Sequence, residues 1–507
     1  MSENDNNKRR QFRAKMNIIV SLLKQFVGLI YGVLVPQLMI STFGSEAYGA
    51  TASITQFLTY VTLLEGGIGG VARASLYKPL ADMDKDTVSA IVYEIKKFFR
   101  IIAVVFIFYV LVLACGFKFI SHIKCFDWFT TFLLVLVISI STFAQYFIGI
   151  SYTVLLEAAQ LSFITDAINI FAVILNTILI ILFINIGLDL VLVKLASSCV
   201  FVLRPLLMWL YVKKKFKLKT VKTDKEYLQQ KWDGLAQHIA YFLHTNTDIA
   251  VLTIFGNLKI VAIYSVYNMI VSQVQNVVTS FSTGMEALFG DMLARNEINE
   301  LRKSFDFYDT FISYVTVILF SITMTMIVPF VKIYTSGIKD ANYVQPVFAV
   351  ILIMASIIAC LRTPYHNLTI AAGHFKQTQV AAYGEAICNI LISILLVLKL
   401  GLIGVAIGTL VATGFRMIYY ALYLSKNIFN RDTTKFVKRE FVNILSIVLI
   451  CLIGFYIQSN LNPLNYLDWI FCSIIVSFVA VVFASALNYV FYKDLFLLTI
   501  KKLFRKA

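Results

Sequence analysis

Residues 234–286 read GLAQHIAYFLHTNTDIAVLTIFGNLKIVAIYSVYNMIVSQVQNVVTSFSTGME, and this stretch decides the fold. It predicts two apolar helices, at 235–256 and 260–284, joined by a tight turn. Each helix is long enough to cross a bilayer, which takes about 20 apolar residues. The same hairpin carries polar side chains at membrane depth: His238, His244, Asn246, Thr247, Asp248, Asn268, Gln273, Gln275 and Asn276.

Asp248 lies near the middle of the first of these helices. A carboxylate at the centre of a membrane span is costly unless it faces protein, water or a partner. Two interpretations follow. Asp248 either lines a polar path and binds an ion, or is a structural residue satisfied by neighbouring backbone or hydroxyl groups. Asn268 and Gln273 on the second helix are predicted to line the same path.

The composition of the whole chain predicts a membrane protein. Of its 507 residues, 59% are hydrophobic and 14% are charged, and the mean hydropathy is +0.80. A soluble chain is about half apolar and a quarter charged. The net charge of +16 lies in short loops, where it indicates orientation and attraction to anionic lipid and not a nucleic-acid partner. The seven cysteines show no metal-ligand spacing, so neither a metal nor a cofactor is expected.

Fourteen apolar segments follow one another along the chain. They are transmembrane helices and not barrel strands, because such strands are about 10 residues of alternating polarity. The fold class predicted is therefore an all-α polytopic membrane protein. The predicted spans are 17–40, 48–72, 98–120, 128–152, 163–186, 189–211, 235–256, 260–284, 308–331, 344–368, 378–398, 402–424, 441–458 and 468–491.

The distribution of lysine and arginine predicts the orientation. With the N-terminus in the cytoplasm, 33 of the 44 basic residues fall in inside segments and at most six fall outside. Both termini are therefore predicted to be cytoplasmic. The predicted organisation is a cytoplasmic tail at 1–16, a six-helix lobe at 17–211, a basic cytoplasmic linker at 212–234, a second six-helix lobe at 235–424, a cytoplasmic loop at 425–440, two further transmembrane helices at 441–491 and a basic cytoplasmic tail at 492–507.

An internal repeat at a distance of about 214–220 residues predicts the two lobes. For example, GLDLV at 187–191 matches GLIGV at 401–405. In each lobe an acid in the fifth span is followed by an arginine in the sixth. Each pair could neutralise itself, as intramembrane charges usually must: Asp166 with Arg204, and Glu385 with Arg416. Two lobes of the same orientation are typical of transporters whose substrate path lies between them.

Charged residues near the inner ends of the first two spans are further candidates for the polar path. Lys24 either snorkels to the membrane surface or binds an anionic group. Glu65 is either a cation or proton site or the counter-ion of Lys24, and the pairing is slightly favoured. Arg73 lies at the cytoplasmic edge of the second span, and Lys194, near the external end of the sixth, is expected to snorkel.

Arg204 and Arg362 are candidate diphosphate contacts, because a planar guanidinium binds phosphate through two parallel hydrogen bonds. The competing interpretation, a lipid-headgroup anchor or a structural ion pair, is favoured for each. No catalytic motif stands in a suitable context. External loops of about a dozen residues also leave little room for a catalytic loop. The sequence thus predicts a transporter and not an enzyme.

Three segments resemble the Wzx-type oligosaccharide flippases of the multidrug/oligosaccharidyl-lipid/polysaccharide exporter superfamily. They are SEAYGATASITQFLTYVTLLEGGIGGVARASL at 45–76, NTDIAVLTIFGNLKIVAIYSVYNMI at 246–270 and AAGHFKQTQVAAYGEAICNI at 371–390. The resemblance implies a V-shaped pair of six-helix bundles around a polar or cationic cavity. Lys24 and Arg73 fall where the family has cationic cavity residues, and Asp248 where it often has an acid. The chain departs from the pattern in lacking a basic residue at mid-depth in span eight.

The function implied is translocation of undecaprenyl-diphosphate-linked oligosaccharide repeat units from the inner to the outer leaflet of a bacterial plasma membrane, for surface polysaccharide assembly. It would be coupled to a proton or sodium gradient, with Asp248 and Glu65 as the ion candidates and a polysaccharide polymerase as a partner. Three alternatives remain: a cation-coupled multidrug exporter, a lipid II flippase, and a non-transporting partner in envelope assembly.

Overall fold

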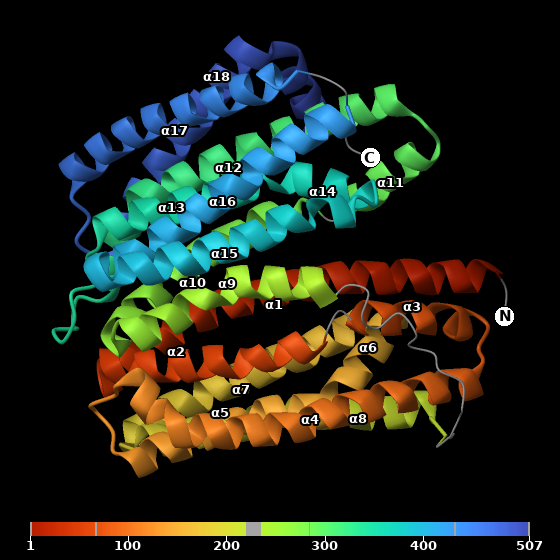
Figure 1. Ribbon diagram of the computed structural model, residues 1–507, viewed down its shortest axis with the longest axis vertical. Coiled ribbons are helices and arrows are strands. Elements are labelled where there is room, and N and C mark those ends of the chain that lie inside the picture. The colour runs from red at the N-terminus through yellow and green to blue at the C-terminus, as the bar shows by residue number, and fades with distance from the viewer. Residues whose placement is uncertain (1–2, 66–67, 220–234, 283, 430–431, 505–507) are drawn as a thin grey trace. The chain divides into compact units, whose positions relative to one another are not determined.

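The computed structural model describes residues 3–65, 68–219, 235–282, 284–429 and 432–504. Every regular element within these ranges is a helix (Figure 1). Eleven of the helices in the described part are long and apolar enough to cross a membrane. The prediction of an all-α polytopic membrane protein is therefore confirmed.

Three of the fourteen predicted spans are not among these eleven. Span 48–72 is interrupted, span 235–256 counts only as a shorter apolar helix at Asn246–Phe255, and span 260–284 carries amide side chains that lower its hydropathy. The single helix predicted at 48–72 is wrong. The chain forms α2 (Ser45–Thr59), a 3₁₀ turn η1 (Tyr60–Glu65) and α3 (Ile68–Ala81). The α-helix thus ends at Thr59, before the glycine-rich sequence at 66–70. Glycine inside a helix is unfavourable.

The chain divides into two compact units. Unit 1 comprises Met1–Phe242 and Asn257–Ala262. Within it, α1 packs on α7, α7 on α8, α8 on α5 and α5 on α4. Besides α2, η1 and α3, its helices are α1 (Glu3–Phe43), α4 (Lys85–Ser121), α5 (Trp128–Ala144), the π-helical turn η2 (Gln145–Gly149), α6 (Ile150–Ala158), α7 (Ser162–Ile186) and α8 (Leu190–Phe216).

Unit 2 comprises Leu243–Gly256 and Ile263–Ala507. Its centre is α12, which packs on α13, α17 and α18. The predicted linker at 212–234 lies mostly outside the described residues. The helices from 235 onward are α9 (Leu235–Phe255), α10 (Leu258–Ser280), α11 (Met285–Ala294), α12 (Ile298–Tyr334), α13 (Pro346–Leu361), α14 (Thr363–Ala371), α15 (Phe375–Leu400), α16 (Leu402–Asn427), α17 (Thr434–Leu461) and α18 (Tyr466–Phe504).

Two glycines allow α15 and α16 to approach each other closely. A Cβ atom on Gly404 would lie 2.5 Å from the backbone carbonyl carbon of Leu396, and one on Gly408 would lie 2.2 Å from Oγ of Ser393. Glycines four residues apart on one helix face are a frequent contact surface between membrane helices. This close contact brings polar side chains of α15 and α16 within hydrogen-bonding distance of each other.

Aspartate side chains cap the N-termini of two helices, at positions outside the predicted spans. Asp84 accepts hydrogen bonds from the backbone N–H groups of Asp86 and Thr87 at 3.1 and 3.0 Å, at the start of α4. Asp127 caps α5 in the same way through Thr130. Hydrogen bonds, from Thr87 in the first case and Thr130 in the second, hold the pKa of each carboxyl below its ordinary value.

Candidate functional site

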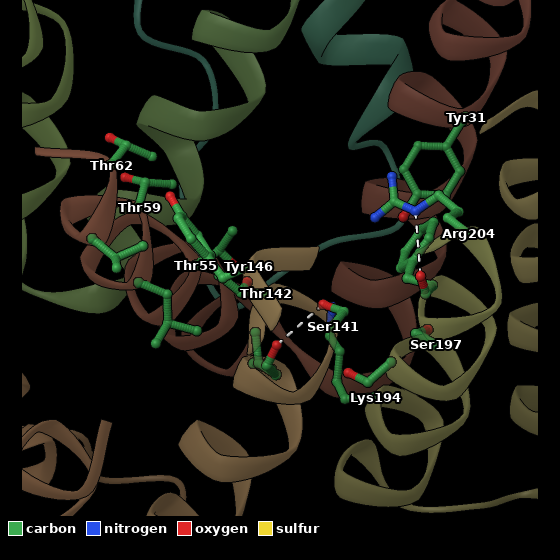
Figure 2. Close-up of a pocket in the computed structure, with 15 residues that line it drawn as sticks. Tyr31, Thr55, Thr59, Thr62, Ser141, Thr142, Tyr146, Lys194, Ser197 and Arg204 are labelled. Carbon is green, nitrogen blue, oxygen red and sulfur yellow. Dashed lines mark hydrogen bonds between the residues drawn. The ribbon is translucent and has the colours of Figure 1, made fainter. Parts of the chain in front are cut away.

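Unit 1 contains a polar pocket of about 350 Å³ within its helical bundle. Residues of α1, α2, η1, α5, η2 and α8 line it. Figure 2 shows hydroxyl-bearing side chains around the pocket, with Arg204 and Lys194 as its two cations. The polar lining residues are Tyr31, Thr55, Thr59, Thr62, Ser141, Thr142, Tyr146, Lys194, Ser197, Ser198 and Arg204.

Arg204 is held in this pocket without a carboxylate partner among the described residues. Its Nη1 donates to Oδ1 of Asn169 at 3.3 Å, and its guanidinium carbon lies 4.4 Å from the centre of the Phe201 ring. The predicted pairing of Arg204 with Asp166 is therefore wrong. Asp166 instead accepts from Nζ of Lys24 at 2.7 Å, because α1 packs directly against α7.

The other charged candidates of the first lobe have partners different from those predicted. Lys24 contacts Asp166 and not Glu65, so the favoured Lys24–Glu65 pairing is also wrong. Glu65 accepts a hydrogen bond from the hydroxyl of Tyr146, a residue of the pocket lining. Arg73 forms a half-exposed ion pair with Glu157 at 2.7 Å, between α3 and α6.

Lys194 was expected only to snorkel, and the structure places it in the pocket wall. Ser197, one turn further along α8, is buried, and its Oγ has no hydrogen-bond partner among the described residues. A buried polar atom without a partner is uncommon in a folded protein and calls for a ligand or a water. In the described part of the chain, no acidic residue lines this pocket. Its chemistry therefore favours an anionic or hydroxyl-rich ligand.

Unit 2 contains a second buried polar cluster, centred on Asp248 of α9. Its Oδ2 accepts from the hydroxyls of Tyr264 and Thr409, each at 2.9 Å. Nδ2 of Asn389 lies 3.4 Å from its Oδ1. Asp248 is 7% exposed, so this carboxylate lies away from solvent and is satisfied by side chains of α10, α15 and α16.

Further oxygen atoms contact Asn389 and Thr409, the partners of the Asp248 carboxylate. Oδ1 of Asn389 lies 3.1 Å from Oγ of Ser393 and 3.3 Å from Oγ1 of Thr409. The carbonyl oxygen of Val405 is 3.2 Å from Oγ1 of Thr409. Asn268 and Gln273 are half-buried on α10, and neither forms a hydrogen bond with Asp248 among the described residues. The side chains of His238 and His244 lie outside the described residues.

Glu385 of α15 is the centre of a third cluster. Its two carboxylate oxygens accept from Arg362 and Arg416, and Arg416 also donates to the hydroxyl of Tyr420 at 3.1 Å. The predicted pairing of Glu385 with Arg416 is confirmed. Arg362, the second diphosphate candidate, shares this carboxylate, and its side chain is 13% exposed. Its guanidinium is thus already engaged by an acid, unlike that of Arg204.

Sequence reasoning missed several of the residues that complete these sites. Asn389 and Thr409 lie on α15 and α16, and nothing in their spacing relates them to Asp248, which lies more than 130 positions earlier. The charge of Lys194 marked it as a candidate in the sequence, but its position near the external end of the span favoured the prediction that it snorkels to the membrane surface. Only the packing of the helices shows which polar side chains meet.

Two bundles of membrane-crossing helices with charged and hydroxyl groups in their interior define a polytopic membrane fold. No protein-family model matches the chain, and no curated protein sequence matches it significantly. Solved structures do match. The lipid II flippase MurJ, in an inward closed conformation, aligns with a TM-score of 0.70 and 14% identity over 94% of this chain and 99% of the flippase.

Transporters of the multidrug MATE family also share the fold. An inward-facing MATE transporter of the MOP superfamily aligns with a TM-score of 0.58 and 12% identity, over 82% of this chain and 98% of its own. The Vibrio cholerae MATE transporter VcmN aligns with a TM-score of 0.54 and 15% identity, over 83% of this chain and 99% of its own. At these identities the likeness shows a common fold. The chain therefore has the fold of the flippases and multidrug transporters of this superfamily.

Proposed function

We propose that the chain translocates undecaprenyl-diphosphate-linked oligosaccharide repeat units from the inner to the outer leaflet of the bacterial plasma membrane, by ion-coupled alternating access. The observation that carries this proposal is the cationic, hydroxyl-lined pocket inside unit 1. Such a lipid carries a charged diphosphate and a hydrophilic sugar past hydrocarbon, while its polyprenyl tail stays in lipid. A polar pocket within a membrane-spanning bundle lowers the cost of desolvating that head.

Arg204 is the residue we assign to the diphosphate. Its planar guanidinium suits bidentate binding of phosphate oxygens. Among the described residues it contacts the amide oxygen of Asn169 and the carbonyl and ring of Phe201, and no carboxylate. Lys194 lies ten residues earlier on α8, about 15 Å along the helix. The two cations thus mark separate parts of the pocket, which leaves the hydroxyl groups between them for the sugar.

The pocket volume agrees with this assignment. Ligand pockets span about 300–1,000 Å³, and the volume here is about 350 Å³. It suits the diphosphate and the first sugar and not a whole repeat unit. The remaining cavity candidates, Lys24, Glu65, Arg73, Asn268 and Gln273, stay predictions, as does Arg362.

Asp248 is the site we assign to the coupling ion. Its Oδ2 lies 2.9 Å from the hydroxyls of Tyr264 and Thr409. The Thr409 hydroxyl also contacts the amide oxygen of Asn389 and a backbone carbonyl oxygen. Carboxylate, hydroxyl and carbonyl oxygens are the ligands that hard cations prefer. A cation or proton there would change how α9, α15 and α16 hold together. An ion gradient gives direction to transport if the ion favours one of two conformations. Glu65, bound to Tyr146 at the pocket of unit 1, is the second ion candidate.

Three alternative functions remain. Two of them, a lipid II flippase and a multidrug exporter, are transport functions of proteins with this fold, and the third involves no transport. Lipid II also carries a polyprenyl diphosphate, so the likeness to MurJ favours it as an alternative substrate. The likeness to MATE transporters and the buried acid Asp248 favour a cation-coupled multidrug exporter. A non-transporting partner of the envelope machinery would leave the pocket of unit 1 without a transported ligand. A polysaccharide polymerase is the partner expected for the first function.

Flipping in proteoliposomes tests the proposal. A fluorescent polyprenyl-diphosphate oligosaccharide is placed in one leaflet, and its transfer is followed by quenching for the wild type and for Arg204→Gln, Asp248→Asn and Lys399→Gln. Lys399 is exposed in the last turn of α15, so its variant is a control for loss of one positive charge. We expect the rate of transfer to fall at least tenfold in the first two variants and to stay unchanged in the control.

Parallel assays separate the alternatives. Transfer of lipid II but not of the oligosaccharide would identify a lipid II flippase. Uptake of an organic cation against a proton or sodium gradient, without lipid transfer, would identify a multidrug exporter. Absence of all three activities in a folded protein would leave the assembly-partner hypothesis.

A further inference from the structure

A separate concave patch lies on the surface of α4, with a volume of about 570 Å³. We call it the α4 basic patch. Its residues recur at intervals of three and four along the helix, so they lie on one face. They comprise Tyr93, Lys96, Lys97, Arg100, Ile101, Val104 and Val105.

Three cations of the patch lie within little more than one helical turn and have no carboxylate partner among the described residues. Nζ of Lys96 lies 4.4 Å from the centre of the Tyr152 ring, and the guanidinium of Arg100 lies 5.1 Å from that of Phe147. These aromatic rings hold two of the three cations in place. Three adjacent like charges repel one another, so a bound anion would stabilise the arrangement.

The apolar part of the patch continues directly from the cations. Ile101, Val104 and Val105 are 58%, 64% and 47% exposed. From Ile101 to Phe117 the helix carries no charged residue, so this stretch lies in the hydrocarbon region of a bilayer. With its 37 residues, α4 is about 55 Å long, well beyond the thickness of that region, about 30 Å. The cations therefore lie at the boundary between hydrocarbon and headgroups.

We propose that the α4 basic patch binds an anionic phospholipid of the bilayer. Its phosphate contacts Lys96, Lys97 and Arg100, and one acyl chain lies along the exposed valines and isoleucine. Basic pockets at the membrane surface bind anionic headgroups in this way, through charge at one end and apolar contact at the other. This site is distinct from the pocket of unit 1 and does not depend on what the protein transports.

A matched pair of triple variants tests the site. The first replaces Lys96, Lys97 and Arg100 by Gln. The control replaces Lys213, Lys214 and Lys215 by Gln, which removes the same charge on the same predicted side of the membrane. Two of the control lysines also lie over aromatic rings, Lys213 over Trp209 at 5.1 Å and Lys215 over Tyr211 at 5.3 Å, but no control lysine lines the concave patch.

Protein purified from mixed phosphatidylglycerol and phosphatidylcholine nanodiscs is analysed by native mass spectrometry for retained phosphatidylglycerol. We expect at least a threefold loss of retained lipid in the first variant and no change in the control. Equal loss of lipid in both variants would show that bulk charge attracts the lipid, and this result would overturn the proposed site. No loss in either variant would overturn it as well. If the triple variant unfolds, Lys97→Gln alone, at an exposed position, should still lower retention.

Competition identifies the source of the anionic head. Excess polyprenyl-diphosphate oligosaccharide should leave the phosphatidylglycerol bound. Its displacement by that substrate would assign the patch to the transported lipid and overturn the proposal.

Discussion

The carboxylate of Glu385 on α15 accepts a hydrogen bond from the guanidinium of Arg416 on α16, and both side chains are buried. Along α15, Asn389 and Ser393 follow Glu385 at intervals of four residues, so all three lie on one face of the helix. Asn389 approaches Asp248 at 3.4 Å. The same helix face thus carries the ion pair at one position and the candidate ion site one turn away.

Replacing Glu385 by Gln should destabilise the protein by about 3–5 kcal/mol, because breaking a buried ion pair leaves charge uncompensated. Here Arg362 and Arg416 would both lose their carboxylate. The free energy of unfolding in detergent, measured by denaturant titration, checks this value.

The control for this substitution is Glu300→Gln. Glu300 pairs with Lys303 at 2.8 Å, but both side chains are more than half exposed. Its loss should change stability by less than about 0.5 kcal/mol, as for most surface ion pairs. Equal effects of the two substitutions would mean that the Glu385 cluster does not stabilise the packing of α15 and α16.

Glycine substitutions in α16 should have opposite effects at two positions. Gly404→Ala would place a Cβ 2.5 Å from the backbone carbonyl carbon of Leu396, and rigid backbone cannot move away without separating α15 from α16. We expect a loss of about 1–3 kcal/mol, as for other overpacked cores. At Gly414 a Cβ meets nothing within 4 Å. There alanine should stabilise the helix by up to about 1 kcal/mol. Thermal unfolding of both variants measures the difference in sign.

Hydropathy was sufficient to predict most of the fold from the sequence. Long apolar runs define the helices because each must satisfy its own backbone hydrogen bonds in lipid. The end of the α-helix at Thr59 was less evident, since the glycines in the sequence after Glu65 are compatible with either close helix packing or a hinge. The Glu385–Arg416 pair joins consecutive spans, as predicted, but the same placement did not make Asp166 pair with Arg204, because α1 brings Lys24 to that carboxylate.

The remaining contacts depend on which helices pack together, and spacing does not reveal this. Lys24 was expected beside Glu65, yet α1 packs on α7, so its amino group reaches Asp166. Asp248 could be identified as buried and polar from the sequence. Its partners Asn389 and Thr409 could not, because they come from distant spans and are individually unremarkable.

Thr409→Val should weaken the dependence of transport on the coupling ion, if Asp248 binds that ion. The substitution keeps the side-chain shape but removes the hydroxyl 2.9 Å from Oδ2 of Asp248. Thr413→Val is the matched control, since the Thr413 hydroxyl donates only to carbonyls of its own helix, at 2.8 and 3.0 Å. We expect about a tenfold rise in the ion concentration for half-maximal transport in the first variant and none in the second. An equal rise in this ion concentration for both variants would show that Thr409 is not part of the ion site.

The thiol of Cys125 should react slowly at neutral pH. It lies in the turn between α4 and α5, where partial burial and then the charge of Glu46 raise its pKa to about 11. The thiolate is the nucleophile that attacks maleimide, so the labelling rate should be low at pH 7.5 and rise steeply as the pH approaches 11. A chain with Cys125 as its only cysteine permits this measurement.

Glu46→Gln is the informative variant for this turn. The Glu46 carboxylate accepts from the backbone N–H groups of Lys124 and Cys125, at 2.6 and 3.2 Å, and a glutamine oxygen can accept the same bonds. The substitution therefore removes the charge and keeps the turn. Without that negative charge the thiolate costs less to form, so the pKa of Cys125 falls and its labelling at pH 7.5 becomes several-fold faster. Slower labelling, or a rate independent of pH, would contradict this account, whereas faster labelling with an unchanged unfolding temperature would support it.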